Sequence, residues 1–481
     1  MKYLAFTLLI IIGAVLALLL FAVIRTLFIK SKVSSYKPVE DEEESLRLAK
    51  KLSEMIKYDT TSHAGVDEAE KFRGFHKVLE ALFPLVHKNL EKTEIDGNLL
   101  YYWKGKSSKK PILLMSHQDV VPAEGQWEHN PFSGDIADGK VHGRGASDTK
   151  CSVMSFFEAV EQLLTEGYTP ECDVYLASSC TEEWAGDGAP KIVEELKRRG
   201  VELFMLCDEG GGIIADPIGG VYGNFAMIGV FEKGKADVKF TAKSTGGHAS
   251  APAANTPIAR LAAFENEIET HSPFKKKLSL EVASMFKSLA PYASFGLKLV
   301  LGNIPVFKPL LLAVLPKISA QAGAMLRTTV AFTMQSGSDA VNVIPQEASV
   351  CANMRFIPHQ GEKESLEIIK KCAKKHGLEM EILHSNDFTP PVNINGEAFK
   401  LMEDVIEKTF PGLPSSPYVM TGATDAQFYQ PICKNCLRFA PVIYGPEQMK
   451  GMHGLNENIE YNCLPGAVRF YKNLIKAQKT R

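Results

Sequence analysis

The fold of this chain is constrained most by three short apolar runs, each followed within a few residues by a histidine or a carboxylate. The runs are residues 112–115, 174–177 and 203–206, and the polar residues that follow them are His117, Glu182 and Asp208. Runs of this length are too short for helices and are typical of buried parallel strands. Because ligands of open α/β sheets bind beyond the carboxyl ends of the strands, we expect these polar side chains to form one site.

The expected site has the composition of a two-metal centre. Asp119, Asp148, Glu183 and His453 add further carboxylates and a second imidazole, and none of the candidate ligands is a cysteine. Imidazole and carboxylate suit zinc, and a bridging carboxylate holds two ions about 3.5–4 Å apart in two-metal hydrolases. The sequence therefore predicts a metal-dependent hydrolase.

Glu182 and Glu183 are adjacent and should play different roles. In an extended segment neighbouring side chains point in different directions, so both can hardly bind the same ion. We expect one of them to be a metal ligand and the other to be free to move a proton.

The polar segments also resemble those of a known family, the M20 metallopeptidases. The matching segments are residues 117–119, 143–150, 182–183, 208–211, 246–250 and 453–457. Residues 119–122, Trp127 and residues 131–134 make the chain most similar to the branch of carboxypeptidase S and the N-fatty-acyl-amino-acid synthase/hydrolases. The resemblance covers roughly residues 45–475, with the motifs in the family's order and spacing.

The resemblance implies a role for each candidate ligand. It makes Asp148 the bridge, His117 and Asp208 the other ligands of one ion, and Glu183 and His453 those of the second. It assigns the general base to Glu182, which takes a proton from water during attack on an amide carbonyl. Asp119 would accept a hydrogen bond from the His117 imidazole and fix its tautomer. The implied cofactor is two Zn²⁺ ions per chain, with Co²⁺ or Mn²⁺ as alternatives.

Substrate recognition is implied for a second set of residues, three of them in the family's lid domain. His248 resembles the lid histidine that reaches a substrate carbonyl, often across a homodimer, while Asn342 and Arg355 resemble lid residues that hold the substrate's free carboxylate. Gly422 resembles a glycine-rich turn beside that carboxylate, although Ala423 replaces a frequent second glycine. Thr149 stands where many members carry an aspartate after a cis peptide bond, so a cis Asp148–Thr149 bond is a further hypothesis.

The expected fold class is α/β, with a mostly parallel, helix-covered sheet in a di-metal exopeptidase-type catalytic domain. From about Phe231 the pattern changes to alternating strands and two helices, which predicts an inserted α+β lid domain. His453 lies beyond this insertion, so the catalytic domain must resume after it. The expected segments are an anchor with its flank (1–32), a linker (33–44), the first catalytic segment (45–230), the lid (231–386) and the second catalytic segment (387–481).

The N-terminus carries a separate signal. Residues 4–24 are uncharged and mostly apolar, and 21 residues at 1.5 Å rise span a hydrocarbon core of roughly 30 Å. The run is longer than the apolar region of a secretory signal peptide, which is usually about 7–15 residues, and this favours a single-pass membrane anchor over a cleaved signal. The flanking charges weakly favour a cytoplasmic catalytic domain, whereas anchored family members more often place it on the lumenal or outer side. The side of the membrane stays open.

Residues 278–326 form a long apolar stretch that a two-helix lid does not require. Pro305, Pro309 and Pro316 interrupt it, so it is not a clear second membrane span. One interpretation is helical packing over the lid or at a subunit contact. The other is an apolar wall for a lipophilic substrate or for the bilayer surface.

Composition excludes some alternatives. The formal net charge of −2 over 481 residues, without a basic stripe, gives no sign of nucleic-acid binding. The nine cysteines lack the spacing of a disulfide framework, and the Cys433–Cys436 pair is expected to be structural rather than a redox or zinc site.

The function predicted first is hydrolysis of a peptide or N-acyl amide bond next to a free carboxylate, by a carboxypeptidase or an N-acyl-amino acid hydrolase. An aminoacylase or dipeptidase of the same family is the alternative. A binding protein without metal is the alternative from a different class. The intact ligand set argues against it, and Glu182→Gln separates the two because a binding protein would not respond to that substitution.

Overall fold

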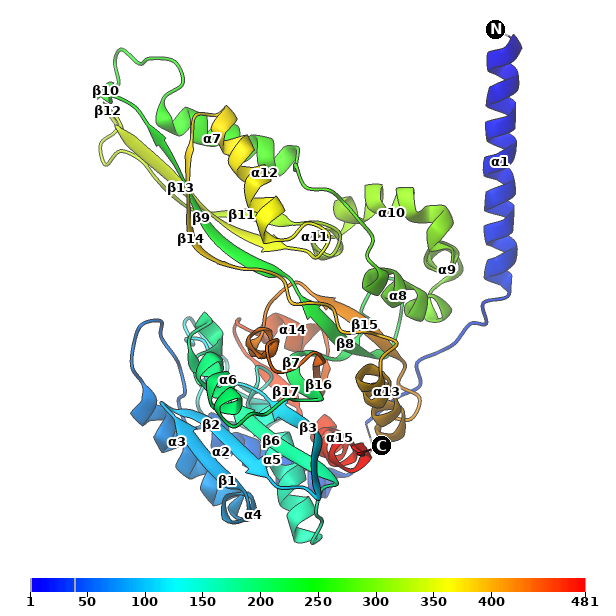
Figure 1. Ribbon diagram of the computed structural model, residues 1–481, viewed down its shortest axis with the longest axis vertical. Helices are drawn as coiled ribbons and strands as arrows, with labels where there is room; N and C mark the ends of the chain where they lie inside the picture. Colours follow the sequence, from blue (N-terminus) through cyan, green and yellow to red (C-terminus); the bar gives the residue numbers. More distant parts are fainter. Residues whose placement is uncertain (1, 39, 481) are drawn as a thin grey trace.

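The three apolar runs lie in neighbouring strands of one sheet, as expected. In the computed structural model, which describes residues 2–38 and 40–480, β3 (Ser107–Met115) lies between β6 (Cys172–Ser178) and β7 (Met205–Ala215) and runs parallel to both. The sheet has eight strands in the order β1-β2-β6-β3-β7-β16-β8-β15 (Figure 1). The other strands are β1 (Glu91–Ile95), β2 (Asn98–Trp103), β8 (Asn224–Glu232), β15 (Ser415–Met420) and β16 (Cys436–Tyr444).

The sheet is mixed rather than uniformly parallel. β7 pairs in parallel with β16, and β8 with β15, whereas β1, β2 and β6 pair antiparallel and β8 turns back antiparallel along β7. The parallel pairs among β6, β3, β7 and β16 therefore occupy the centre of the sheet, where the expected site residues leave the strands. β7 extends farther than expected, so that Asp208 lies inside the strand rather than beyond its end.

Helices cover both faces of this sheet because side chains of a strand alternate between faces. Ile112 and Leu114 belong to one buried cluster, and Leu113 and Met115 to another. The first cluster contains α2 (Glu42–Ile56), α5 (Lys150–Thr165), α13 (Glu397–Thr409) and α15 (Leu464–Ala477). The second contains α6 (Gly188–Arg198) and the 3-10 turn η3 (Asp425–Tyr429). The other helical elements of these parts of the chain are α3 (Ala69–Leu82), α4 (Pro84–Asn89), η1 (Glu182–Trp184), α14 (Pro446–Gly451) and η4 (Tyr461–Cys463).

A second unit follows β8 and carries its own core. Its four-stranded antiparallel sheet has the order β11-β13-β9-β14, and two helices pack on that sheet (Figure 1). The strands are β9 (Gly234–Lys243), β11 (Thr329–Ser336), β13 (Glu347–Phe356) and β14 (Glu379–Asn386), and the helices are α7 (Pro257–Thr270) and α12 (Glu362–Lys375). A two-stranded ribbon of β10 (Gly247–His248) and β12 (Val343–Ile344) forms the tip of the unit. The assignment of this unit as a lid, and the domain boundaries, stay predictions.

The apolar stretch 278–326 folds into short helices beside the base of the second unit. They are α8 (Leu280–Leu289), η2 (Ala290–Tyr292), α9 (Phe295–Gly302), α10 (Ile304–Ile318) and α11 (Ala320–Ala324). Pro309 and Pro316 lie inside α10, and α9 and α10 meet at a bend of 106°. We refer to residues 295–318 as the hairpin.

The N-terminal apolar segment forms α1 (Lys2–Leu27), which projects from the rest of the molecule (Figure 1). Among the described residues it is the only unbroken helix that is long and apolar enough to cross a membrane. A signal sequence would pass the same test. The two hairpin helices pass that test only when counted together as one bent span.

A three-stranded sheet brings the C-terminal segment of the chain to the catalytic sheet. It consists of β4 (Ile136–Ala137), β5 (Lys140–His142) and β17 (Asn458–Glu460), in the order β17-β5-β4. The pairing of Asn458 with His142 holds the segment containing His453 and Glu457 beside the loop that carries Asp148.

Candidate metal centre

The structure brings together His117, Asp148, Glu183 and His453. Nε2 of His117 lies 3.2 Å from Oδ1 of Asp148, and Nε2 of His453 lies 3.0 Å from Oδ2 of the same carboxylate. Nε2 of His453 is also 3.0 Å from Oε2 of Glu183. The two oxygens of Asp148 thus face two different imidazoles, which is the arrangement that a bridging ligand requires.

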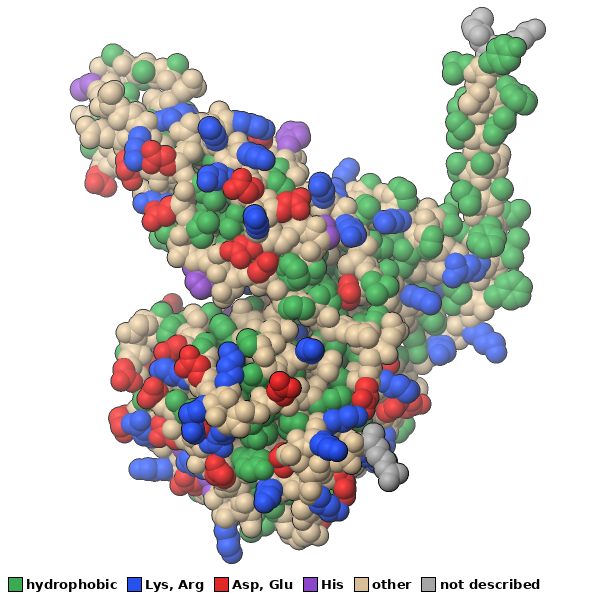
Figure 2. All heavy atoms as spheres, viewed as in Figure 1, with side chains coloured by type: hydrophobic (Ala, Val, Ile, Leu, Met, Phe, Trp, Pro, Cys, Tyr) green, Lys and Arg blue, Asp and Glu red, His purple; other side chains and the backbone are tan. Residues whose placement is uncertain are grey.

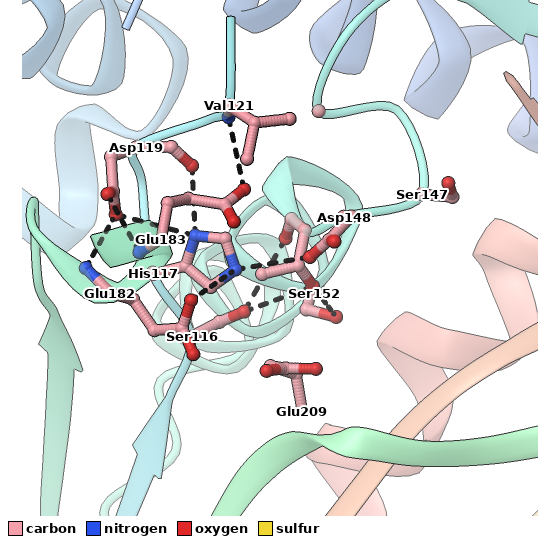
Figure 3. A network of polar contacts seen from close by, with 12 residues as sticks. Ser116, His117, Asp119, Val121, Ser147, Asp148, Ser152, Glu182, Glu183 and Glu209 are labelled. Atoms are coloured by element: carbon pink, nitrogen blue, oxygen red, sulfur yellow. Dashed lines mark hydrogen bonds and ion pairs between the residues drawn. The ribbon is translucent and has the colours of Figure 1, made fainter. Parts of the chain in front are cut away.

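Asp119 holds both the imidazole and the glutamate pair in place (Figure 3). Its backbone oxygen lies 2.9 Å from Nδ1 of His117, and its carboxylate lies 3.5 Å from the same nitrogen. The carboxylate accepts hydrogen bonds from the backbone N–H groups of Glu182 and Glu183, both at 3.2 Å. The predicted contact to His117 is therefore made mainly through the main chain, while the side chain of Asp119 orients η1.

Glu182 and Glu183 make different contacts, and they lie in a 3-10 turn rather than in the expected extended segment. Glu183 accepts a hydrogen bond from the backbone N–H of Val121 at 3.2 Å and contacts His453. Oε2 of Glu182 lies 3.9 Å from Nε2 of His117, beyond hydrogen-bonding distance. Glu183 is thus arranged as a ligand and Glu182 as the freer carboxylate.

Glu457 organises the loop that carries Asp148, and no role was predicted for it. Its buried carboxylate accepts hydrogen bonds from the backbone N–H groups of Gly145, Ser147 and Asp148 at 2.9–3.1 Å. It also pairs with the buried guanidinium of Arg144 at 2.8 Å. Both residues lie in the segments that carry the family resemblance, but only the fold reveals their contact, because 312 residues separate Gly145 from Glu457.

The pKa values of several side chains in the cluster are shifted from their ordinary values. Burial lowers the pKa of His117, but contacts with Asp119 and Asp148 outweigh this and leave the pKa raised. Hydrogen bonds to Asp148 and Glu183 raise the pKa of His453 to about 10. Burial raises the pKa of Glu182, and the nearby Asp425 and Glu209 raise it further. A buried excess of carboxylates stabilises bound cations, so the donor set fits metal ions.

The ligand geometry supports this fit. One donor atom each from His117, Asp148 and Glu183 lies within 4.8 Å of the other two. Cys433 and Cys436 do not belong to such a cluster in the described residues; they are buried free thiols in the core under α6.

Asp208, which was predicted as a ligand, directs both carboxylate oxygens to backbone amides. Oδ1 of Asp208 accepts a hydrogen bond from the N–H of Glu209 at 2.8 Å, and Oδ2 accepts one from the N–H of Ala426 at 3.0 Å. Neighbouring side chains of a strand point to opposite faces, so Glu209 points toward the cluster instead (Figure 3). Burial raises the pKa of Glu209, and the charge of Asp148 raises it further. Glu209 is therefore the better candidate for the fifth ligand.

The predicted recognition residues lie outside the cluster. His248 and Asn342 lie together at the exposed tip of the second unit, where the backbone N–H of Ala249 donates to the carbonyl of Asn342 at 2.9 Å. Arg355 is half-buried at the base of that unit, and its Nε donates to Asn353 at 3.0 Å. Gly422 follows β15, and a Cβ added there would meet no atom within 4 Å. The Asp148–Thr149 peptide bond is cis, as the resemblance suggested.

Comparison with known proteins assigns the family. Residues 113–477 match the peptidase family M20/M25/M40. The chain belongs to the M20 peptidase family. The N-fatty-acyl-amino acid synthase/hydrolase PM20D1 of Xenopus tropicalis is 32% identical to this M20 enzyme over 449 residues, covering 91% of this chain and 87% of the relative. The probable carboxypeptidase S-like 2 of Dictyostelium discoideum is 31% identical over 443 residues, covering 90% and 85%.

A solved structure agrees with the fold. The M20 family metallo-carboxypeptidase Sso-CP2 from Sulfolobus solfataricus superposes on this M20 enzyme with a TM-score of 0.67 at 21% identity, covering 90% of this chain and 99% of that one. The predicted family and α/β fold class are confirmed. The chain is an M20-type metallopeptidase, and the enzyme class acts on C–N amide bonds.

Proposed function

We propose that this M20 enzyme is a membrane-anchored two-metal hydrolase that cleaves the amide bond of N-acyl amino acids carrying a long acyl chain. The observation that carries the substrate class is a cavity of about 650 Å³. Glu209, Gly210 and Gly211 form its polar end, beside the metal cluster. Its far walls come from α8, α9, α10 and α11, with Phe286, Leu301, Leu311 and Leu315 among them.

The cavity has the character of a lipophilic binding site. Its volume falls within the roughly 300–1,000 Å³ of typical ligand pockets, which combine apolar walls with a few polar groups. A substrate with its amide at Glu209 would extend its acyl chain between the apolar helices. The name of the Xenopus relative, an N-fatty-acyl-amino acid synthase/hydrolase, supports the same substrate class.

The proposed metal ligands follow from the geometry of the cluster. Asp148 would bridge two ions, His117 and Glu209 would complete one site, and Glu183 and His453 would complete the other. The donor set favours zinc, with cobalt or manganese as substitutes. When bound, the ions would supply a Lewis acid for the amide carbonyl and would make water acidic enough to lose a proton near neutral pH.

In this scheme Glu182 moves the proton. It accepts a proton from water as the water oxygen attacks the acyl carbon, and it donates that proton to the amide nitrogen as the C–N bond breaks. The raised pKa of Glu182, caused first by burial, suits a group that must both accept and release a proton. Asp119 keeps Glu182 in position through the backbone of η1. The products are a fatty acid and an amino acid.

The second unit would act as a lid that recognises the carboxylate. Arg355 and Gly422 would hold the free carboxylate of the substrate, since a guanidinium pairs well with a carboxylate. His248 and Asn342 lie at the exposed tip, which suits a contribution to the site of a partner subunit in a homodimer. Residues 231–386 would form this lid, and residues 45–230 and 387–481 the catalytic domain.

We infer further that α1 stays attached as the membrane anchor, through residues 4–24. Most of the described side chains of α1 are exposed, among them Leu4 at 77% and Phe21 at 58%, so the helix requires an apolar surrounding.

A hydrolysis panel tests the substrate class. N-acetyl, dipeptidyl and N-oleoyl derivatives of one amino acid are compared by kcat/KM with the full chain in detergent. Each buried methylene contributes about 0.8 kcal/mol, so the oleoyl derivative should exceed the acetyl derivative by orders of magnitude. A preference for the dipeptide would instead support the second candidate, a carboxypeptidase, which the Dictyostelium relative's name suggests.

A further inference from the structure

The outer face of the hairpin is apolar although its inner face already lines the cavity. Leu311 and Leu315 point into the cavity, while Leu310 is 50% exposed and Val314 is 38% exposed on another side of α10. Phe295, at the start of α9, is 53% exposed. A surface helix in water is normally polar on its outer face, so this face is built to meet an apolar medium.

Asn303 ties the hairpin to the last turns of α1. Its Nδ2 lies 2.9 Å from Oγ1 of Thr26 and 3.3 Å from the carbonyl oxygen of Ala22, and all three residues are buried. Gly302 lies so close to Ile29 that a Cβ added to the glycine would clash with Cδ1 of the isoleucine. The foot of α1 and the hairpin therefore form one packed unit, in which removal of α1 would expose a buried amide.

The two segments that build this unit lack acidic residues. Neither residues 1–39 nor residues 282–338 contain an acidic residue. Both segments carry lysine or arginine, and Lys30, Lys308 and Lys317 are exposed. Several lysine and arginine side chains lie near the hairpin and the foot of α1 on the face shown in Figure 2. Basic side chains that border an apolar face attract anionic lipid headgroups.

We propose that the hairpin is an in-plane membrane-docking element that inserts into the interface of an anionic bilayer and delivers acyl chains from the lipid to the cavity. Ile318 lines the cavity and is 71% exposed, so the rim of the cavity reaches the hairpin surface. The delivery step rests on the proposed N-acyl amino acid hydrolysis. Docking itself does not depend on it.

This arrangement fixes how the molecule sits on the membrane. The second unit reaches the level of α1 in Figure 1, so an upright α1 would bring that unit into the lipid. A tilted α1 would allow the second unit to stay in water while the hairpin touches the surface. Membrane helices tilt by up to about 40°, so this geometry is an ordinary one.

Lipid quenching tests the docking directly. The full chain with Cys351→Ser, which removes the one cysteine that is not buried, is reconstituted in phosphatidylcholine–phosphatidylserine vesicles. A fluorophore is attached to Leu310→Cys or, as the control, to Leu383→Cys on β14, where the native side chains are 50% and 53% exposed. Lipids with a nitroxide on the acyl chain should quench the probe at residue 310 and leave the probe at residue 383 bright. Equal fluorescence at both positions would overturn the proposal.

Substrate delivery is tested with a matched pair of charge variants. Leu310→Glu with Val314→Glu should lower hydrolysis of vesicle-held N-oleoyl amino acid at least about tenfold and leave soluble N-acetyl amino acid unaffected. Ile382→Glu with Leu383→Glu is the control on β14 and should change neither rate. An equal loss on both substrates would show misfolding of the hairpin and would count against delivery. If the wild-type enzyme hydrolyses neither substrate, the proposed function fails, while the quenching result still decides whether the hairpin docks.

Discussion

The two ends of the cavity are built in opposite ways. In the metal cluster beside the polar end, His117, Asp148 and Glu183 are fixed by directional contacts of about 3 Å between imidazoles, carboxylates and backbone amides. At the apolar end, short helices supply nonpolar side chains, and α10 runs through both Pro309 and Pro316. Directional contacts tolerate little displacement, whereas the hydrophobic effect is non-directional and follows buried area. Changes at the polar end should therefore stop the reaction for every substrate, and changes at the apolar end should alter which substrates are used.

The sharpest test of this contrast is Glu182→Gln. Loss of the general base should lower kcat by about 10²–10⁴-fold, equally for N-acetyl and N-oleoyl amino acids, because both need the same proton transfer. Metal content, measured by mass spectrometry, should stay unchanged. A variant that retains activity within tenfold on either substrate would remove Glu182 from its role.

The second test changes Glu457, which holds the loop that carries Asp148. Glu457→Gln deprives the buried Arg144 of its charged partner, and breaking a buried ion pair typically costs about 3–5 kcal/mol. The free energy of unfolding, measured with denaturant, should fall by that order. Glu447→Gln is the control because its ion pair with Lys140 is exposed, and it should cost at most about 1 kcal/mol. Similar losses of unfolding free energy in both variants would show that the buried Arg144–Glu457 pair stabilises the fold no more than the exposed Lys140–Glu447 pair.

The third test is made at the apolar end. Leu315→Ser removes a leucine side chain from the cavity wall. It should raise the activation free energy that corresponds to kcat/KM for N-oleoyl amino acid by roughly 1.5–3 kcal/mol, the free energy of burying a leucine side chain. N-acetyl amino acid should be used as before, since it does not reach this wall. Comparison of the two rates separates the effect from general destabilisation, which would lower both. A flat dependence on chain length in the wild-type enzyme would contradict the acyl-binding cavity.

The fourth test decides between two adjacent acids. Glu209→Gln should weaken the binding of one of the two metal ions by at least about tenfold, so that dialysis leaves fewer ions per chain. Asp208→Asn should keep both, because Asp208 binds backbone amides rather than the cluster. The reverse order of metal loss would restore Asp208 as the ligand and would exclude the assignment of Glu209.

This choice also shows where prediction from the sequence stops. The apolar runs predicted β3 and β6, and the residue types around His117 and Asp148 predicted a metal cluster, because strand length and ligand chemistry are local properties. The N–H of Ala426, which lies far along the chain, donates a hydrogen bond to Asp208. This contact helps to determine which side of β7 faces the cluster. No local pattern around Asp208 contains that contact.

The apolar stretch gives the same lesson in another form. Its composition predicted an apolar wall or a packing surface, and the prolines predicted interruptions. The bend between α9 and α10 is local, whereas the contact of Asn303 with Thr26 joins residues 277 positions apart. Residue spacing within the stretch could not reveal that contact, because Asn303 taken alone resembles any other polar residue in a loop.

A further expected effect concerns the junction between the two regions. Lys233 follows β8 and is buried, and its Nζ donates to the carbonyl oxygens of Ala324 and Arg327 at 2.9 and 3.0 Å, where the apolar stretch ends. Burial, together with the charges of Arg355 and Arg327, lowers the pKa of Lys233 from 10.5 to about 7. Between these two values the unfolded chain binds a proton that the folded chain does not bind. The free energy of unfolding should therefore rise with pH in this window.

The variant Lys233→Met isolates this contribution. Because a single proton is involved, the wild-type enzyme should gain on the order of 2 kcal/mol relative to Lys233→Met between pH 7 and pH 9, measured by denaturant unfolding at both values. Lys235→Met, at a more exposed lysine on β9, should track the wild-type enzyme. If Lys233→Met keeps the wild-type pH dependence, Lys233 is charged in the folded state. The junction would then be held by a buried cation and its carbonyl partners, and the apolar stretch would be tied to the catalytic sheet by directional contacts like those at the polar end.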